Sequence, residues 1–343
     1  MTNNLFLVLI LLNLTFVFSL EARQAEQKEK TDSTFLQSTI RFDNSSLKKI
    51  VLYPETILDN PQSFWDNDPA YKLYKLWHQF VSYPVDMEQW KKNLQSYVDI
   101  PNNERHQNSQ LIISQKSLNK EETDYFNERA IPYLYSFLPK DCPPIDATIY
   151  FTTAILPNGF QMGNDVVIYG ENSDKENLFI HELFHRCQRA CETISDKKES
   201  NNPELDQIYL LLWIEGTATY AGYKALYEFQ AVDPLLQNDY KLLEDTMNII
   251  QLRNKLNVLY ESKASNLINK NELQTKLIQT GIIDRAFYIV GFDMASVIDD
   301  KLGRDVLKET LLHGPDYFIQ KYNSVVSDAD KIFDFYSIGK IQY

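Results

Sequence analysis

Apolar residues recur at helical spacing along most of this 343-residue chain. Between residues 69 and 80, and again between 87 and 98, an apolar side chain returns every three or four positions, which predicts an amphipathic helix in each segment. The same spacing predicts later helices over residues 210–220, 235–261, 272–280, 286–301, 304–312 and 317–322. A predominantly helical protein is therefore expected.

Two short runs interrupt this helical pattern. Residues 147–151 and 165–169 are rich in β-branched and aromatic side chains, and Pro157, Gly159 and Gly163 lie between them. Such runs predict paired strands joined by a longer loop. We therefore predict an α+β fold, with a helical subdomain over residues 49–140 and a mixed domain over residues 141–343.

The N-terminal 48 residues have a different character. Residues 5–18 are apolar except for Asn13 and Thr15, a run that is short for a membrane span and typical of a signal peptide. Cleavage after Ser19 would give a secreted or periplasmic protein without stable membrane insertion. The alternative is that residues 5–18 are not removed and remain as a membrane anchor. The polar residues 20–48 predict a flexible leader.

Charge and cysteine content narrow the possible partners. The formal net charge of −13 argues against a nucleic-acid partner, because phosphate binding needs clustered Lys and Arg. The chain has three cysteines, an odd number for an oxidising compartment. A disulfide from Cys142 to Cys187 or Cys191 would pin a loop to the helix that follows it.

The segment His181-Glu182-Leu183-Phe184-His185 points to a metal site. Residues four apart share one face of a helix, so His181 and His185 can both reach one Zn²⁺ at roughly 2.0–2.1 Å. Glu182 lies about 100° around the helix, a position that suits a base taking a proton from water. A capping box at residues 173–176 predicts that this helix covers about residues 174–191.

Catalytic zinc sites use three protein ligands, so a third ligand is required. The metzincin pattern would need Gly at position 188 and His at position 191, where this chain has Gln188 and Cys191, and that pattern is excluded. Glu215 lies in an otherwise apolar helix, where a carboxylate is costly unless a cation or metal compensates it. Alternatively, the Glu215 carboxylate is compensated by an ion pair with Arg285 or Arg189.

Small residues follow Glu215 at helical spacing. Ala218, Thr219 and Gly222 extend the face that carries Glu215, and such a strip would let another helix pack closely. We therefore expect Glu215 to reach a metal held by a neighbouring helix.

Together, the His181–His185 motif and the segment from Trp213 to Tyr220 resemble the gluzincins. The similarity is greatest to poorly characterised, predicted secreted zinc-protease families that carry an E-G-x-A-x-Y motif, and it covers roughly residues 146–320. It implies a gluzincin-like core with His181, His185 and Glu215 as zinc ligands and Glu182 as general base. One departure is Thr219, where thermolysin-type sequences have a carboxylate, so the groups around the ligands are expected to differ.

The same resemblance suggests where substrate would bind. In gluzincins a strand just before the metal helix forms the sheet edge along which an extended peptide lies, and residues 165–169 occupy that place. The alternative is that these strands are simply core. Tyr288, in a Tyr-x-x-Gly segment, is the first candidate for the donor that stabilises the oxyanion, and His313 is the second. Tyr220 and Tyr223 remain further candidates.

These observations favour an exported zinc metallopeptidase that acts on peptides or proteins. The alternatives are a catalytically weak relative that binds a cell-surface or extracellular partner, and a helical structural or adhesion protein in which the motif is accidental.

Overall fold

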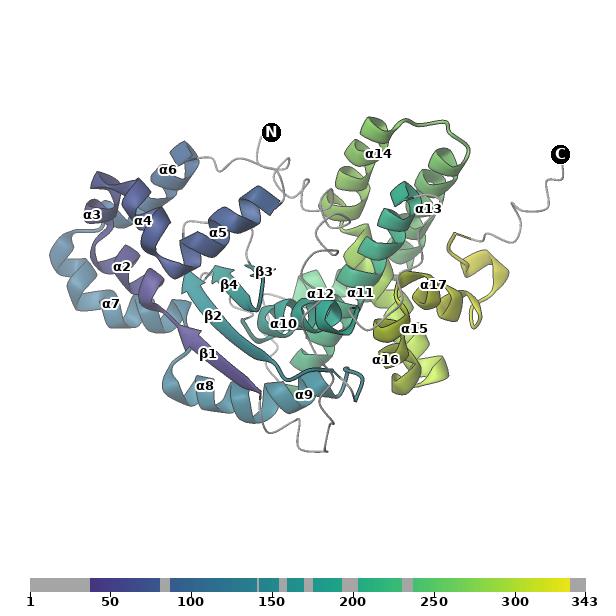
Figure 1. Cartoon of the computed structure of the whole chain (residues 1–343), viewed down its shortest axis with the longest axis horizontal. Coiled ribbons are helices and arrows are strands. Elements are labelled where there is room, and N and C mark those ends of the chain that lie inside the picture. The colour runs from purple at the N-terminus through teal and green to yellow at the C-terminus, as the bar shows by residue number, and fades with distance from the viewer. Residues whose placement is uncertain are drawn as a thin grey trace, which may run out of the picture. The chain divides into compact units, whose positions relative to one another are not determined.

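The computed structural model describes residues 38–80, 87–140, 142–153, 159–169, 175–192, 203–229 and 237–333. The expected signal peptide, most of the expected leader and the capping residue Ser173 lie outside these ranges. Within them the predicted α+β fold is confirmed, since the chain is predominantly helical with one small mixed sheet (Figure 1).

The described residues form two compact units. One unit contains residues 38–134 and 143–186, and the other contains residues 135–142 and 187–333. The division falls within helix α10 (Lys175–Glu192), so the two halves of this helix belong to different units.

A four-stranded sheet organises the first unit. Its order is β1-β2-β4-β3, formed by β1 (Thr39–Asp43), β2 (Asp146–Thr152), β3 (Gly159–Met162) and β4 (Asp165–Tyr169). Strands β1, β2 and β4 are parallel to one another, whereas β3 is antiparallel to β4. Figure 1 shows β1 beside β2, although they are far apart in sequence.

Strand β1 was not expected, because its five residues fall in the polar segment assigned to a flexible leader. Ile40 is buried, and the ring of Phe42 lies against those of Phe126 and Phe151 at centroid distances of 5.4 and 6.2 Å. Two apolar residues among charged neighbours give little periodic signal. Strand β1 is therefore recognised only from its pairing with β2 and its packing in the folded structure.

Strand β4 coincides with the predicted residues 165–169, but its expected place at the sheet edge is wrong. It lies between β2 and β3, and Val166, Val167 and Ile168 are fully buried. Gly163, at φ +61°, allows the tight turn that folds β3 back along the outer side of β4. Among the described strands, β3 is therefore the edge on this side, and the core alternative holds for β4.

Helices cover the rest of the first unit. They are α2 (Ser45–Leu52), α3 (Pro54–Asp59), α4 (Pro61–Asn67), α5 (Pro69–Phe80), α6 (Met87–Val98), α7 (Asn102–Lys116), α8 (Lys120–Tyr125), the π-helical η3 (Phe126–Ala130) and α9 (Ile131–Tyr135), which ends in the second unit. The helices predicted over residues 69–80 and 87–98 are confirmed as α5 and α6. Helices α3 and α4 both begin with a proline. Proline suits the first helical position because it lacks the N–H group that would have no acceptor there.

The second unit is helical throughout its described residues. Its elements are the second half of α10, then α11 (Pro203–Phe229), α12 (Gln237–Glu244), α13 (Thr246–Ala264), α14 (Lys270–Lys276), the π-helical η4 (Leu277–Ile283), α15 (Ala286–Leu302), α16 (Arg304–His313), α17 (Pro315–Asn323) and the 3-10 turn η5 (Asp328–Asp330). The single helix predicted over residues 235–261 is wrong. Asp245 ends α12 and caps α13, because its carboxylate accepts hydrogen bonds from the backbone N–H groups of Met247 and Asn248.

None of the helices in the described ranges combines the length and the apolar character that crossing a membrane requires.

Candidate metal centre

Helix α10 starts on the sheet of the first unit. Phe179 packs against Phe42, Phe126 and Phe151 at centroid distances of 5.9, 5.4 and 5.7 Å. This aromatic cluster fixes the first half of the helix, so the imidazoles that follow Phe179 project from a rigid element. The observed bounds, Lys175–Glu192, match the predicted helix to within one residue at each end.

His181 and His185 face one another on α10. Their Nε2 atoms are 3.0 Å apart, the ring planes are perpendicular, and both side chains are half-buried. Two nitrogens bound tetrahedrally to one Zn²⁺ at roughly 2.0–2.1 Å would lie about 3.3 Å apart. The observed pair is therefore close to the spacing that a shared zinc ion requires.

Glu215, on α11, completes a cluster with these histidines. One ligand atom from each of His181, His185 and Glu215 lies within 4.8 Å of the other two, and all three side chains are half-buried. Two imidazoles and one carboxylate form a donor set that holds catalytic zinc and leaves a fourth position for water. The residues present therefore fit a zinc ion.

The sequence suggests roles around this cluster for both Glu182 and Arg285. Glu182, which follows His181 directly in the sequence, is buried, with an exposed fraction of 7%. Arg285, one of the cations considered as an alternative partner for Glu215, lies with its guanidinium 5.3 Å from the centre of the Tyr288 ring.

Helix α15 contacts α11 directly after Glu215. A Cβ atom on Gly216 would lie only 2.3 Å from the Cα of Gly291, so the two backbones touch at these glycines. Sequence reasoning expected close packing on the strip from Ala218 to Gly222 and missed Gly216, whose partner lies 75 positions further along the chain. The glycine of the E-G-x-A-x-Y motif thus serves helix packing.

The candidate oxyanion donors differ in their surroundings. Tyr288 is half-buried on α15, one turn before Gly291. His313 is exposed at the end of α16, with its ring centre 4.8 Å from that of Tyr317. The hydroxyls of Tyr220 and Tyr223 donate hydrogen bonds to carboxylates, those of Asp299 and Glu244.

Thr219 has an unusual environment for a hydroxyl. Its side chain is 8% exposed, and its Oγ1 has no hydrogen-bond partner among the described residues. It stands one turn after Glu215, at the position where thermolysin-type sequences have a carboxylate.

The expected disulfide is not found. Cys142, Cys187 and Cys191 all lie within the described residues, are buried, and form no disulfide in the structure. Buried thiols pack as small apolar groups, so the presence of Cys187 and Cys191 on α10 needs no cross-link.

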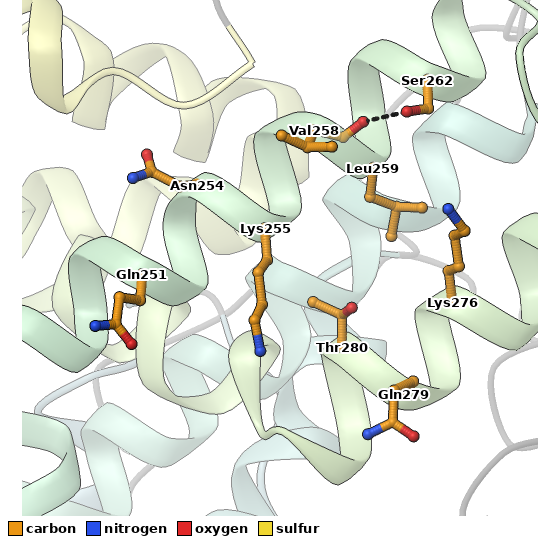
Figure 2. Close-up of a pocket in the computed structure, with 9 residues that line it drawn as sticks. All are labelled: Gln251, Asn254, Lys255, Val258, Leu259, Ser262, Lys276, Gln279 and Thr280. Atoms are coloured by element: carbon orange, nitrogen blue, oxygen red, sulfur yellow. Dashed lines mark hydrogen bonds between the residues drawn. The ribbon is translucent and has the colours of Figure 1, made fainter.

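A surface pocket of about 430 Å³ lies on different elements, α13, α14 and η4. Figure 2 shows its lining, in which Leu259 is the buried apolar residue and Lys255 and Lys276 are exposed cations. None of the candidate metal ligands lines this pocket.

Comparison with known proteins agrees with the chemistry of the cluster. No curated protein and no solved structure matches the chain. One family model matches residues 56–331, a range that contains α10, α11 and α15 but not β1. Because this match spans most of the sequence, the chain belongs to the family described as "Putative zinc dependent peptidase (DUF5700)".

Proposed function

We propose that this protein is an exported zinc metallopeptidase of the gluzincin type, with His181, His185 and Glu215 as ligands. The convergence of these three side chains within 4.8 Å carries the proposal. The family supports zinc-dependent peptidase chemistry in general. The gluzincin assignment rests on the order of the ligands, two on one helix and a glutamate on the next.

In this proposal Glu182 is the general base. Bound zinc would polarise the peptide carbonyl and lower the pKa of the attacking water. Glu182 follows His181 directly, takes a proton from that water and passes it to the leaving amine. Its burial suits this role, because a carboxylate shielded from bulk solvent holds the proton between the two steps.

Tyr288 is the proposed donor to the oxyanion. The contact between Gly216 and Gly291 brings α15 against α11 beside Glu215, and Tyr288 lies one turn before that contact. The guanidinium of Arg285 near its ring supports an electropositive environment, which suits a group that stabilises negative charge.

The proposed substrate is an extended peptide that pairs with β3. Among the described strands β3 has a neighbour on one side only, so its outer edge can accept main-chain hydrogen bonds. This proposal replaces the one made for residues 165–169, which are internal to the sheet.

Two measurements test the proposed function. After extensive dialysis the protein should retain about one equivalent of zinc and should hydrolyse a fluorogenic unfolded protein. The variant Glu182→Gln should retain the zinc and lose the hydrolysis, because its amide cannot accept the proton. Hydrolysis by the variant at the wild-type rate would reject Glu182 as base, and absence of zinc from the wild type would reject the metal site. Zinc binding without hydrolysis of any substrate offered would favour the alternative, a binding module.

Export has its own test. The intact mass of protein recovered from outside the cytoplasm of an expressing cell should correspond to a chain that begins at Leu20. A chain that retains residues 1–19 would contradict cleavage after Ser19.

A further inference from the structure

A buried amide joins the two helices that carry the candidate ligands. Gln188, one turn after His185 on α10, donates from Nε2 to the Oγ1 of Thr217 at 2.7 Å and to the backbone oxygen of Ile214 at 3.1 Å. Thr217 in turn donates to the backbone oxygen of Trp213 at 2.8 Å. Both Gln188 and Thr217 are 2% exposed, and both belong to the second unit.

These acceptors lie on both sides of Glu215 in the sequence. Ile214 immediately precedes Glu215, and Thr217 follows it by two positions. The two acceptor residues are therefore close to Glu215, the proposed ligand on α11. In the same way, Gln188 is close to His185, a proposed ligand on α10. Gly216, between the two acceptors, contacts Gly291 of α15. The four residues from Ile214 to Thr217 thus fix α11 against two other helices.

The hydrogen bonds of Gln188 fix the register of α10 against α11, which apolar contacts alone would not do. Apolar burial is non-directional, so it tolerates sliding and rotation of one helix on another. Two hydrogen bonds from one amide have defined lengths and angles, and they hold a single register. Metal sites tolerate errors of about 0.2 Å in ligand distance, so the register between α10 and α11 decides whether Glu215 meets the histidines.

We propose that Gln188 is a positioning residue for the metal centre, which it preorganises by locking α10 to α11 through Thr217 and Ile214. This proposal rests on the proposed function, since it assumes that Glu215 and the histidines bind one zinc ion. Gln188 is not one of the proposed zinc ligands. Its role is to set the separation of the ligands before zinc arrives.

The test measures zinc affinity in competition with a chromogenic chelator. The variant Gln188→Met keeps the side-chain volume and removes the donor, and it should weaken zinc binding about 10-fold or more, as loss of outer partners of metal ligands typically does. Thr217→Val should also weaken binding, because it removes one of the two acceptors. Thr217→Ser keeps the hydroxyl and should restore the affinity to within about 2-fold of wild type.

Thr310→Val provides the matched control. Thr310 is also a fully buried threonine that contacts α11, since its Oγ1 accepts from the indole N–H of Trp213 at 3.4 Å, but it lies on α16 and makes neither of the hydrogen bonds that join Gln188 to α11. This variant should lose thermal stability and keep the zinc affinity of the wild type. A purely structural role for Gln188 would give the same result as Thr310→Val.

The absorption of the cobalt-substituted protein provides a second readout. If Gln188 positions the ligands, the d–d bands of Gln188→Met should shift or weaken, and those of Thr310→Val should not. Wild-type affinity and bands in Gln188→Met would overturn the positioning role while leaving the zinc site standing. Should Gln188→Met fail to fold, Thr217→Val and Thr217→Ser decide, and equal zinc affinity in those two variants would overturn the proposal. Absence of zinc binding by the wild type would overturn the proposed function together with this inference.

Discussion

The hydroxyl of Tyr220 donates a 2.7 Å hydrogen bond to the carboxylate of Asp299, which links α11 to α15. Arg304 donates to the same carboxylate oxygen from Nε at 2.8 Å, and its guanidinium lies 3.8 Å from the centre of the Phe137 ring. Burial raises the pKa of Asp299, but the hydrogen bonds from Arg304 and Tyr220 outweigh it and hold this pKa below its ordinary value. The tyrosine of the E-G-x-A-x-Y motif is thus part of a half-buried ionic cluster.

Tyr220→Phe should therefore affect stability in a pH-dependent way. A hydrogen bond to a charged group contributes about 1.5 kcal/mol, so the variant should lose about that much free energy of unfolding at neutral pH. A carboxyl whose pKa is lowered by folding stabilises the protein above its unfolded pKa of about 4, and the stabilisation disappears as the pH falls through the folded pKa. The difference between variant and wild type should shrink in that acidic range. Urea unfolding at a series of pH values measures it, and a difference that stays constant to pH 2 would contradict the assignment.

Gly216→Ala should be severely destabilising. Its Cβ would meet the Cα, carbonyl carbon and oxygen of Gly291 at 2.3 to 2.7 Å, and backbone atoms cannot rotate away. Overpacking against a rigid neighbour costs about 3 kcal/mol or more, and separation of α11 from α15 should also weaken zinc binding. Urea unfolding and chelator competition measure the two effects.

Gly163→Ala is the control for the glycine substitution itself. Gly163 has a positive φ of +61° but nothing within 4 Å of an added Cβ, so only the backbone conformation is penalised, at about 1 to 2 kcal/mol. The variant should keep wild-type zinc affinity. If Gly216→Ala were no more destabilising than Gly163→Ala, the backbone contact between α11 and α15 would be disproved.

Local patterns were sufficient for the long amphipathic helices and for two of the four strands. The helix that carries His181 and His185 could be predicted because its signal, a capping box followed by apolar residues around the two histidines, lies within a few turns. The helix around Glu215 could be predicted for the same reason, because an uninterrupted apolar run with a single carboxylate is a local feature. It is present as part of α11. Strand β1 and the place of β4 within the sheet depend on pairing with distant segments, which no local pattern reports.

The environment of Glu215 shows the same limit. Its convergence with the histidines was expected from the cost of burying a carboxylate, whereas the helix contact at Gly216 and the amide of Gln188 were not. A glycine in a helix is ambiguous until its partner is known, and Gly291 is 75 positions away. In the sequence, Gln188 is informative only as a departure from the metzincin pattern. The structure shows that its amide bonds to α11, a contact that depends on tertiary structure.

Thr219→Val should stabilise the metal-free protein. The Oγ1 of Thr219 is buried without a partner among the described residues, and an unsatisfied buried hydroxyl costs about 1 to 3 kcal/mol. Valine has nearly the same shape and lacks the hydroxyl, so the free energy of unfolding should rise by about 1 kcal/mol. Thr217→Val is the matched comparison, because the Thr217 hydroxyl makes two hydrogen bonds and its loss should destabilise. Destabilisation by both variants, measured in urea with a zinc chelator present, would show that the Thr219 hydroxyl has a partner.

Tyr288→Phe separates the proposed oxyanion donor on α15 from Tyr220 and Tyr223 on α11. A donor that acts only as negative charge develops on the carbonyl oxygen contributes to kcat, so its removal should lower kcat by about 100-fold or more and leave KM nearly unchanged. Zinc content should not change, because the phenol is not among the proposed ligands. Tyr220→Phe and Tyr223→Phe are controls, since their hydroxyls donate to Asp299 and Glu244, and each should retain kcat within a few-fold of wild type. A loss of kcat in His313→Ala with full activity in Tyr288→Phe would move the role to the exposed histidine at the end of α16.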